Sequence, residues 1–284
     1  MTPQSPKQFG VCSWSLRAAD AADMAAKAKA VGVKNVQLGL VAHREDAGLV
    51  HGVVEALGKQ GIKVGSGMFC TDGEDYTTPE TIRLTGGVVP DQFWDENWRR
   101  AQVAAGTAKE LGLKLVTMHA GFLPHDRKDP TFNKLIDRVV KIARVFADNG
   151  VTLTFETGQE TAETLVIFLD ELDRRGATNT GVNFDPANMI LYDMDEPVAA
   201  LRQVASRVKH VHIKDAIRTT VKGQWGQEVV VGTGQVDWTA FLQVLADADY
   251  KGYLMIEREA GDDRVGDMRA GKTYLEKLMR GPKK

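Results

Sequence analysis

The segment GVNFDPAN, residues 181–188, is the part of the sequence that decides the fold. It begins with apolar residues and ends with a carboxylate, Asp185, followed by a proline. This pattern is typical of a buried parallel strand that places one charged group at its carboxyl end. We therefore interpret Asp185 as a side chain presented to a site, and look for strands that end in the same way.

Three other apolar runs also end in a charged or metal-binding side chain. They end at Glu156, His212 and Glu257. Glu156 precedes Asp185 by 29 residues, and His212 follows it by 27, which is close to the ~30 residues of one strand–helix unit. The interval of 45 residues from His212 to Glu257 is longer because an insertion rich in glycine occupies residues 218–235.

The whole chain alternates between short apolar runs and helical segments, in eight units. Residues 132–146, for example, carry apolar side chains at the 3.6-residue period of a helix. The strands are continuous apolar runs, as expected when helices cover both faces of a parallel sheet. We predict a single (β/α)8 TIM barrel over residues 1–284, with its active site at the carboxyl ends of the strands. The alternative, an open doubly wound sheet, lacks a glycine-rich fingerprint after its first strand.

Two segments depart from the alternation. Residues 71–90 are rich in Asp, Thr, Gly and Pro and are predicted to be an irregular functional loop. Within the insertion, residues 228–231 are interpreted as one arm of a hairpin.

The composition is that of an ordinary soluble protein, with 43% hydrophobic and 26% charged residues. A net charge of -2 gives no basic excess, so no nucleic-acid partner is expected. No segment approaches the ~20 apolar residues of a membrane span. Residues 1–8 lack the apolar core of a signal peptide, and two cysteines do not form a disulfide framework. We expect a cytoplasmic protein without a membrane partner.

In a barrel, Glu156, Asp185, His212 and Glu257 would lie at the ends of four neighbouring strands. One such glutamate alone would more often cap a helix or form an ion pair. Four in register favour a metal site, and an oxygen-rich set with one imidazole suits Mn²⁺, Mg²⁺ or Co²⁺, with Zn²⁺ as a further candidate.

Other residues near strand ends are candidates for substrate binding. His119 would polarise a substrate oxygen, Lys214 would bind an anionic or keto oxygen, and Trp14 would form a flat wall for a sugar ring. Each also has a purely structural interpretation, as a bonded histidine, an ion-paired lysine and a core tryptophan. Cys12 and Cys70 have no histidine partner in the sequence and are interpreted as packing residues. His210 is expected to pack inside the barrel.

Several motifs resemble those of the xylose isomerase-like barrel superfamily. Within it, the chain is most similar to the sugar phosphate isomerase/epimerase group, which includes ketose 3-epimerases, hydroxypyruvate isomerases and inosose dehydratases. The motifs are FETG at 155–158, NFDPAN at 183–188, HVHIKD at 210–215, GTGQVD at 232–237 and IE at 256–257.

The resemblance implies one divalent ion, Mn²⁺ in the first place, held by Glu156, Asp185, His212 and Glu257. It also implies that Glu156 and Glu257 form an acid–base pair acting on a small carbohydrate, and it leaves a homo-oligomer open. A proton next to a carbonyl leaves when the carbonyl is polarised and a carboxylate accepts it. Its return then gives epimerisation or isomerisation, whereas loss of a β-oxygen substituent gives elimination.

Two positions bear on the substrate. Ketose epimerases of this family contact substrate through an arginine at the offset of Arg218. They commonly carry a histidine at the position of Asn188, which can hydrogen-bond a hydroxyl group but cannot titrate. A free-ketose 3-epimerase therefore fits less well.

Three alternatives follow from the same residues. A lyase or dehydratase acting on an inosose or 3-keto-glycoside would begin with the same proton abstraction. The DNA-repair endonuclease branch of the superfamily uses a polynuclear zinc site, and six histidines without a basic excess argue against it. A barrel kept only for binding would have broken ligand positions, but all four are present.

Overall fold

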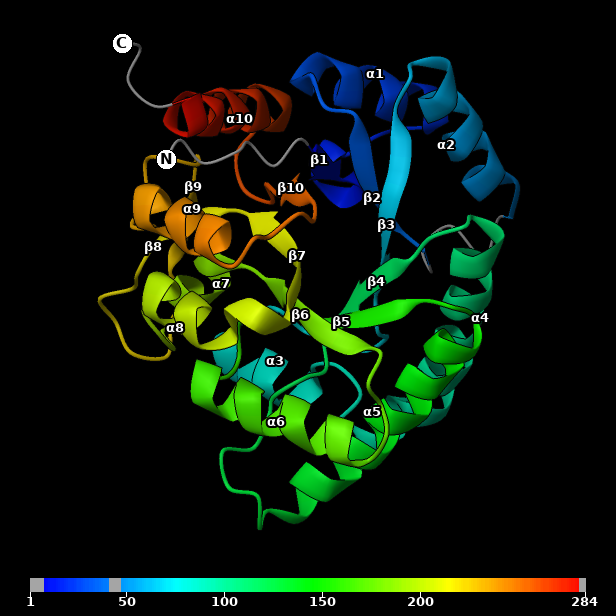
Figure 1. The fold of residues 1–284 in the computed structure, drawn as a ribbon, viewed down its shortest axis with the longest axis vertical. Coiled ribbons are helices and arrows are strands. Elements are labelled where there is room, and N and C mark those ends of the chain that lie inside the picture. Colours follow the sequence, from blue (N-terminus) through cyan, green and yellow to red (C-terminus); the bar gives the residue numbers. More distant parts are fainter. Residues whose placement is uncertain (1–7, 41–46, 281–284) are drawn as a thin grey trace.

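The computed structural model describes residues 8–40 and 47–280, which contain a closed barrel of eight parallel strands (Figure 1). Each strand pairs with its neighbours in parallel register, so all carboxyl ends lie at one mouth of the barrel. In order around the barrel the strands are β1 (Phe9–Cys12), β10 (Leu254–Ile256), β7 (Val208–Ile213), β6 (Thr180–Phe184), β5 (Thr152–Glu156), β4 (Leu115–Met118), β3 (Lys63–Phe69) and β2 (Asn35–Gly39). The predicted (β/α)8 barrel is confirmed, and the open sheet is excluded.

Helices surround the barrel, and most successive outer helices pack side by side (Figure 1). The long ones are α1 (Ala21–Val31), α2 (Ala47–Lys59), α4 (Trp94–Glu110), α5 (Pro130–Asp148), α6 (Ala162–Arg174), α8 (Pro197–Val204), α9 (Trp238–Asp247) and α10 (Arg264–Arg280). The hydrophobic core lies between this ring and the strands, as expected for strands covered on their outer face.

Helix α5 illustrates why these segments are helical. Asp129 caps its first turn by accepting from Thr131 N at 2.8 Å, and Pro130 occupies the first helical position, where its missing N–H costs nothing. The predicted apolar stripe along 132–146 is buried against the barrel. Truncating Leu135, which is fully buried, to alanine would cost about 2–5 kcal/mol.

The prediction that residues 71–90 are irregular is wrong in part, because they contain helix α3 (Pro79–Thr85). Thr78 and Thr81 form a capping box in which each side chain binds the other's backbone N–H, and Pro79 follows the cap. The first apolar run of the sequence, from Phe9 to Ser15, was expected to be the first strand, but the strand is shorter. It ends at Cys12, and the following residues form a 3-10 helix, η1 (Ser13–Leu16), which carries Trp14.

A second short helix follows directly after β6. Residues 186–188, interpreted from the sequence as a strand end, begin helix α7 (Pro186–Leu191). Asp185 is its N-cap and accepts from the backbone N–H groups of Ala187 and Asn188. The carboxylate therefore has two neighbours dictated by the local chain, which positions it rigidly.

The insertion folds as a hairpin. Strand β8 (Asp215–Ile217) pairs antiparallel with β9 (Gln227–Val229), in a register that sets Asp215 opposite Val229. The expected hairpin arm is confirmed, but it spans residues 227–229 rather than 228–231.

No helix within residues 8–40 and 47–280 is long and apolar enough to cross a membrane. Residues 1–7, which carry most of the expectation about a signal peptide, lie outside the described residues. The same holds for residues 41–46 and 281–284 of the predicted domain.

Candidate active site

The structure brings the four predicted ligands together at the carboxyl ends of β5, β6, β7 and β10, which are neighbours in the barrel. One ligand atom from each of Glu156, Asp185, His212 and Glu257 lies within 4.8 Å of all the others. His212 Nδ1 lies 3.2 Å from Glu156 Oε1, 3.5 Å from Glu257 Oε2 and 3.8 Å from Asp185 Oδ2. Every one of these residues is at most 9% exposed. This is a compact site of three carboxyl groups around one imidazole.

Only one of the two carboxyl oxygens of Asp185 is hydrogen-bonded to a described residue. Its Oδ1 accepts from Ala187 N at 2.8 Å and Asn188 N at 3.0 Å. Its Oδ2 is buried and has no hydrogen-bond partner among residues 8–40 and 47–280. Burial raises the pKa of Asp185 to about 7, against the lowering effect of the Lys214 ammonium. A buried oxygen without a donor costs roughly 1–3 kcal/mol, which a bound cation would remove. The residues present therefore fit a divalent ion.

A buried amide sets the orientation of the His212 ring. Gln37 Nε2 donates to Gly67 O at 3.2 Å, which turns Gln37 Oε1 toward His212 Nε2 at 2.7 Å. His212 Nε2 therefore carries a proton and donates it to the amide, which leaves Nδ1 facing the carboxyl groups. A hydrogen bond of this kind to the far ring nitrogen commonly orients a metal-binding histidine.

Charge dominates the titration of His212. Burial alone would lower its pKa, but the negative charges of Glu156 and Glu257 raise that pKa well above its usual value. Without a metal the imidazole is a cation among carboxylates. A bound cation would displace the Nδ1 proton, as metal binding to histidine requires.

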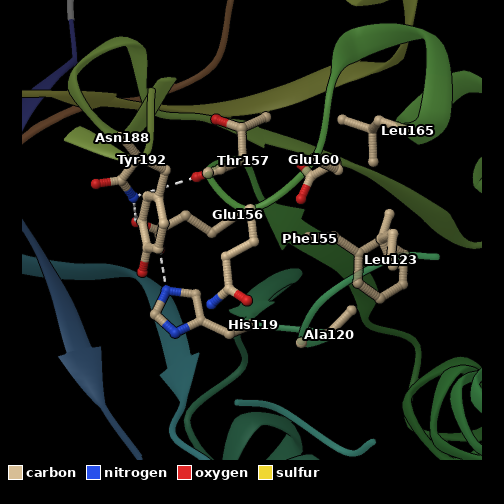
Figure 2. A pocket seen from close by; sticks show the side chains of 13 residues that line it. His119, Ala120, Leu123, Phe155, Glu156, Thr157, Glu160, Leu165, Asn188 and Tyr192 are labelled. Atoms are coloured by element: carbon tan, nitrogen blue, oxygen red, sulfur yellow. Dashed lines mark hydrogen bonds and ion pairs between the residues drawn. The ribbon is translucent and has the colours of Figure 1, made fainter. Parts of the chain in front are cut away.

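Glu156 is held from the side of β4 and α7. His119 Nε2 lies 3.2 Å from Glu156 Oε2, and Asn188 Nδ2 donates to Glu156 Oε1 at 3.0 Å (Figure 2). Burial would raise the pKa of Glu156, but His212 and His119 hold it well below its usual range. Two of the predicted substrate-binding residues, His119 and Asn188, thus touch Glu156, and their contact with substrate stays a prediction.

Glu257 is held from the opposite side of the mouth. Trp14 Nε1 donates to Glu257 Oε1 at 2.6 Å, and Lys214 Nζ donates to Glu257 Oε2 at 3.0 Å. Burial would raise the pKa of Glu257, but Lys214 and His212 lower it to about 2. Trp14 therefore also orients a carboxylate, a contact that the interpretation as a flat wall did not include. Lys214 also binds Glu259 Oε2 at 2.8 Å, so it is ion-paired.

Arg218 lies at the start of the hairpin loop. Its guanidinium donates to Asp193 Oδ1 at 2.5 Å and to the carbonyl oxygen of Asp195 at 2.7 Å. These bonds tie the hairpin to the segment that follows α7. The contact of Arg218 with substrate stays a prediction.

The interpretation of the two cysteines as packing residues without a histidine partner is confirmed only for the burial of Cys12. Cys12 is buried, but its Sγ lies 3.8 Å from His212 Nε2, directly beneath the site. Burial raises the pKa of this thiol to about 12. Cys70 is exposed. His210, in contrast, is buried inside the barrel as expected, where it bonds Ser66 Oγ and Asn183 Oδ1, each at 2.9 Å.

Two loops far apart in the sequence meet over the mouth. Tyr76, from the segment before α3, places its hydroxyl 2.8 Å from His119 Nδ1. Trp225, from the hairpin, donates its indole N–H to the carbonyl oxygen of Tyr76 at 3.2 Å. Its ring meets the ring of Tyr192 edge-on, with the two ring centroids 4.7 Å apart. This cover encloses the Glu156 side of the site.

The sequence interpretation missed Gln37 and Tyr76. Gln37 did leave a signal, since an amide inside the apolar strand 35–39 must find a buried partner. Tyr76 left none, because its contact with His119 depends on how a long loop folds back over the mouth.

Comparison with known proteins shows the family. The model of a family described as xylose isomerase-like TIM barrel matches residues 21–278. A crystal structure of a xylose isomerase domain protein from Planctomyces limnophilus has a TM-score of 0.84 and 29% identity, and covers 99% of this chain and 98% of that one. The fold is also like that of 3-keto-D-glucoside 4-epimerase from E. coli, with a TM-score of 0.69, 16% identity and coverage of 95% and 98%.

Among curated proteins, inosose dehydratase from Clostridium botulinum (strain Alaska E43) is 28% identical over 144 residues, which are 45% of this chain and 47% of the relative. The chain thus matches about half the length of the curated relatives. These similar proteins thus include an epimerase and a dehydratase. From the extent of the family match, the chain belongs to the xylose isomerase-like TIM barrel family.

Proposed function

We propose that this protein is a divalent-metal-dependent sugar isomerase or epimerase that removes a proton next to a carbonyl and proceeds through an enediolate. The observation that carries the proposal is the geometry of the mouth. Glu156 on β5 and Glu257 after β10 flank Asp185 and His212, which come from the two strands between them. A sugar bound over Asp185 and His212 would have a glutamate carboxylate on each side.

Glu156, Asp185, His212 and Glu257 would hold the ion, for which Mn²⁺ is our first choice and Mg²⁺, Co²⁺ and Zn²⁺ are the others. When bound, the ion would draw electron density from the carbonyl oxygen and stabilise the negative charge that develops there.

The side chains around the four predicted ligands keep the two glutamates ionised and oriented for proton transfer. The low pKa values of Glu156 and Glu257 keep both ionised, so each can accept a proton from the carbon next to the carbonyl. Trp14 fixes the direction of the Glu257 carboxylate. Asn188 and His119 lie beside Glu156, where they can bind hydroxyl groups of the same sugar.

A second candidate function is a dehydratase or lyase acting on an inosose or a 3-keto-glycoside. The 28% identity with inosose dehydratase over 144 residues favours it. The first step would be the same proton abstraction. The outcome would differ afterwards, because a hydroxyl or glycosidic oxygen on the next carbon would leave instead of a proton returning.

Deuterium exchange tests the shared first step. Protein stripped with a chelator and reloaded with Mn²⁺ would be incubated in D₂O with D-fructose, 2-keto-myo-inositol and a 3-keto-glucoside, and followed by NMR. We expect deuterium at the carbon next to one of these carbonyls. The Glu257→Gln variant should exchange about 10²–10⁴-fold more slowly. Glu163→Gln, on the exposed face of α6, is the matched control.

The products distinguish the two candidates. A new stereoisomer or an aldose identifies an epimerase or isomerase, and loss of one water or of the aglycone identifies a lyase. Absence of exchange with every compound, or exchange by Glu257→Gln at the rate of the parent, would exclude the proposed chemistry.

A further inference from the structure

A small cavity opens beside Glu156, between the ends of β4 and β5 and helix α7 (Figure 2). Its volume is about 20 Å³, which is room for one water molecule or one hydroxyl group. His119, Glu156 and Asn188 form the side toward the proposed reaction site, and Leu123 and Leu165 lie on the other side. A hydroxyl group entering this cavity would lie next to Glu156, one of the four predicted ligands.

Two hydrogen-bond acceptors in the wall of the cavity have no donor. Glu160 is only 4% exposed, and its Oε1 is buried without a hydrogen-bond partner among residues 8–40 and 47–280. Gln159 Oε1 is in the same condition. Leaving a buried acceptor unmet costs roughly 1–3 kcal/mol, and here two adjacent residues carry that cost. The arrangement calls for a donor that is not part of the described chain.

The remaining bonds of these residues keep the acceptors in place. The backbone N–H groups of Gly158 and Gln159 bind the Glu160 carboxyl group. The Gln159 side chain is hydrogen-bonded to the Tyr192 hydroxyl. Among the described residues that line the cavity, none is a lysine or an arginine. Burial raises the pKa of Glu160 to about 8, so at neutral pH its carboxyl group is mostly protonated and uncharged. At Glu160 and Gln159 the wall thus presents neutral oxygen groups, and it lacks the lysine and arginine cations with which proteins usually bind phosphate.

We propose that this cavity is a subsite for one hydroxyl group of an uncharged polyhydroxy substrate, a keto-sugar or keto-cyclitol, and that Glu160 and Gln159 select against a phosphorylated one. The identification of the bound polyol as the substrate rests on the proposed function. The hydroxyl group would donate to one of the two free oxygens. A phosphate group at the same place is too large for the cavity and would find no lysine or arginine among the described residues of its wall.

Calorimetric titration of the Mn²⁺-loaded protein tests the subsite without depending on turnover. The probes are myo-inositol and D-glucitol, each compared with its monophosphate. We expect the uncharged polyols to bind at least about 10-fold more tightly than their phosphates, since one well-placed buried hydrogen bond is worth roughly 1.4 kcal/mol or more.

Three variants test whether Glu160 and Gln159 contribute to polyol binding. Glu160→Leu and Gln159→Leu should each weaken polyol binding by about 10-fold or more, because an acceptor is lost. Glu160→Gln keeps an acceptor oxygen and should bind polyols within about 3-fold of the parent, on the same reasoning. Gln203→Leu, on the exposed face of α8, is the matched control for the amide substitution.

Tighter binding of the phosphates, or polyol binding that Glu160→Leu and Gln159→Leu leave unchanged, would overturn the subsite. The same conclusion would follow if Glu160→Leu lowered only stability, because the cavity would then hold a structural water. If Glu160→Leu does not fold, Gln159→Leu and the preference of the parent protein between polyol and phosphate decide the question.

The two proposals fail separately. Deuterium exchange together with polyol binding that ignores both residues would remove the subsite and keep the proposed function. Polyol binding that depends on Glu160, without exchange at any carbonyl, would remove the proposed function and keep a polyol-binding site. Absence of both polyol binding and exchange would remove both.

Discussion

Asp185 and Asp215 are both fully buried aspartates that follow an inner strand of the barrel, yet their surroundings differ completely. All the oxygen capacity of Asp215 is used by five donors. They are Ala216 N at 2.9 Å and Val236 N at 3.2 Å on Oδ1, and Gly232 N at 2.8 Å, Gly234 N at 3.1 Å and Trp238 Nε1 at 3.0 Å on Oδ2. Asp185 has two donors on Oδ1 and none on Oδ2 among residues 8–40 and 47–280.

The difference separates a carboxylate that builds the fold from one that is presented to a ligand. Asp215 organises the GTGQVD turn at 232–237, and Gly234 must be a glycine there because a Cβ atom would lie 2.2 Å from Asp215 Oδ1. Asp185 caps α7 with one oxygen and offers the other to the site. A buried charge that is only partly bonded weakens a fold, so its presence points to a use outside the fold.

The largest effect should follow from changing the bonded carboxylate. In Asp215→Asn, the amide nitrogen cannot accept and would face backbone N–H groups, so charge-assisted bonds worth about 1.5–3 kcal/mol each are lost. We expect the free energy of unfolding to fall by roughly 3–5 kcal/mol, measured by urea denaturation. A loss below about 1 kcal/mol would show that the five bonds do not support the fold.

The same change at Asp185 should affect metal binding rather than stability. Asp185→Asn keeps an oxygen for the α7 cap and removes a buried charge, so the metal-free protein should unfold within about 1 kcal/mol of the parent or be more stable. Mn²⁺ at about 100 times its dissociation constant should stabilise the parent by roughly 2.7 kcal/mol and the variant by much less. Thermal melts with and without Mn²⁺ measure both quantities. Equal stabilisation of the two proteins by Mn²⁺ would contradict the role of Oδ2.

A weaker effect on the same site is expected from Gln37. In Gln37→Leu, His212 Nε2 loses its acceptor, so the ring is no longer held with Nδ1 toward the carboxyl groups. We expect Mn²⁺ affinity to fall by about 10–100-fold, as for other partners of metal-binding histidines. Gln37→Glu, which keeps an acceptor, should restore most of it. Unchanged affinity in the leucine variant would mean that packing alone orients the ring.

The smallest effect concerns a third carboxylate, Glu171, whose oxygens are taken by arginines at the protein surface. Arg174 and Arg175 lower the pKa of Glu171 from 4.5 to about 2. A lowered pKa stabilises the fold above the pKa of the unfolded chain, and this contribution disappears as the pH falls from 4.5 toward 2. Glu171→Gln should lower stability at neutral pH by about 1 kcal/mol, because surface ion pairs contribute little. The difference from the parent should vanish near the acidic end of this range. A difference that persists there would assign the effect to packing.

Much of the fold could be predicted because apolar runs recur at the length of one strand–helix unit. The barrel and the meeting of Glu156, Asp185, His212 and Glu257 follow from that spacing and from the parallel strand order. Helices α3 and α7 were not predicted, because they are short and depend on caps rather than on periodic apolar residues. The cap signal at Thr78–Thr81 was present in the sequence, and so was that at Asp185.

The surroundings of the site were harder to predict because they depend on contacts between distant parts of the chain. Gln37 and His212 are 175 residues apart, and Trp225 and Tyr76 are 149 apart. Glu160 stands in a loop where its sequence neighbours give no sign of burial. Such residues can be identified only once the conformation of the loops at the mouth is known.

The most direct test of the central claim, that the free oxygen of Asp185 belongs to a metal site, is a titration of chelator-treated protein with Mn²⁺, with free Mn²⁺ followed by electron paramagnetic resonance. We predict that the parent binds one Mn²⁺ per chain and that Asp185→Asn, although folded, binds none over the same concentrations. Failure of the parent to bind Mn²⁺, or equal binding by the two proteins, would contradict this account.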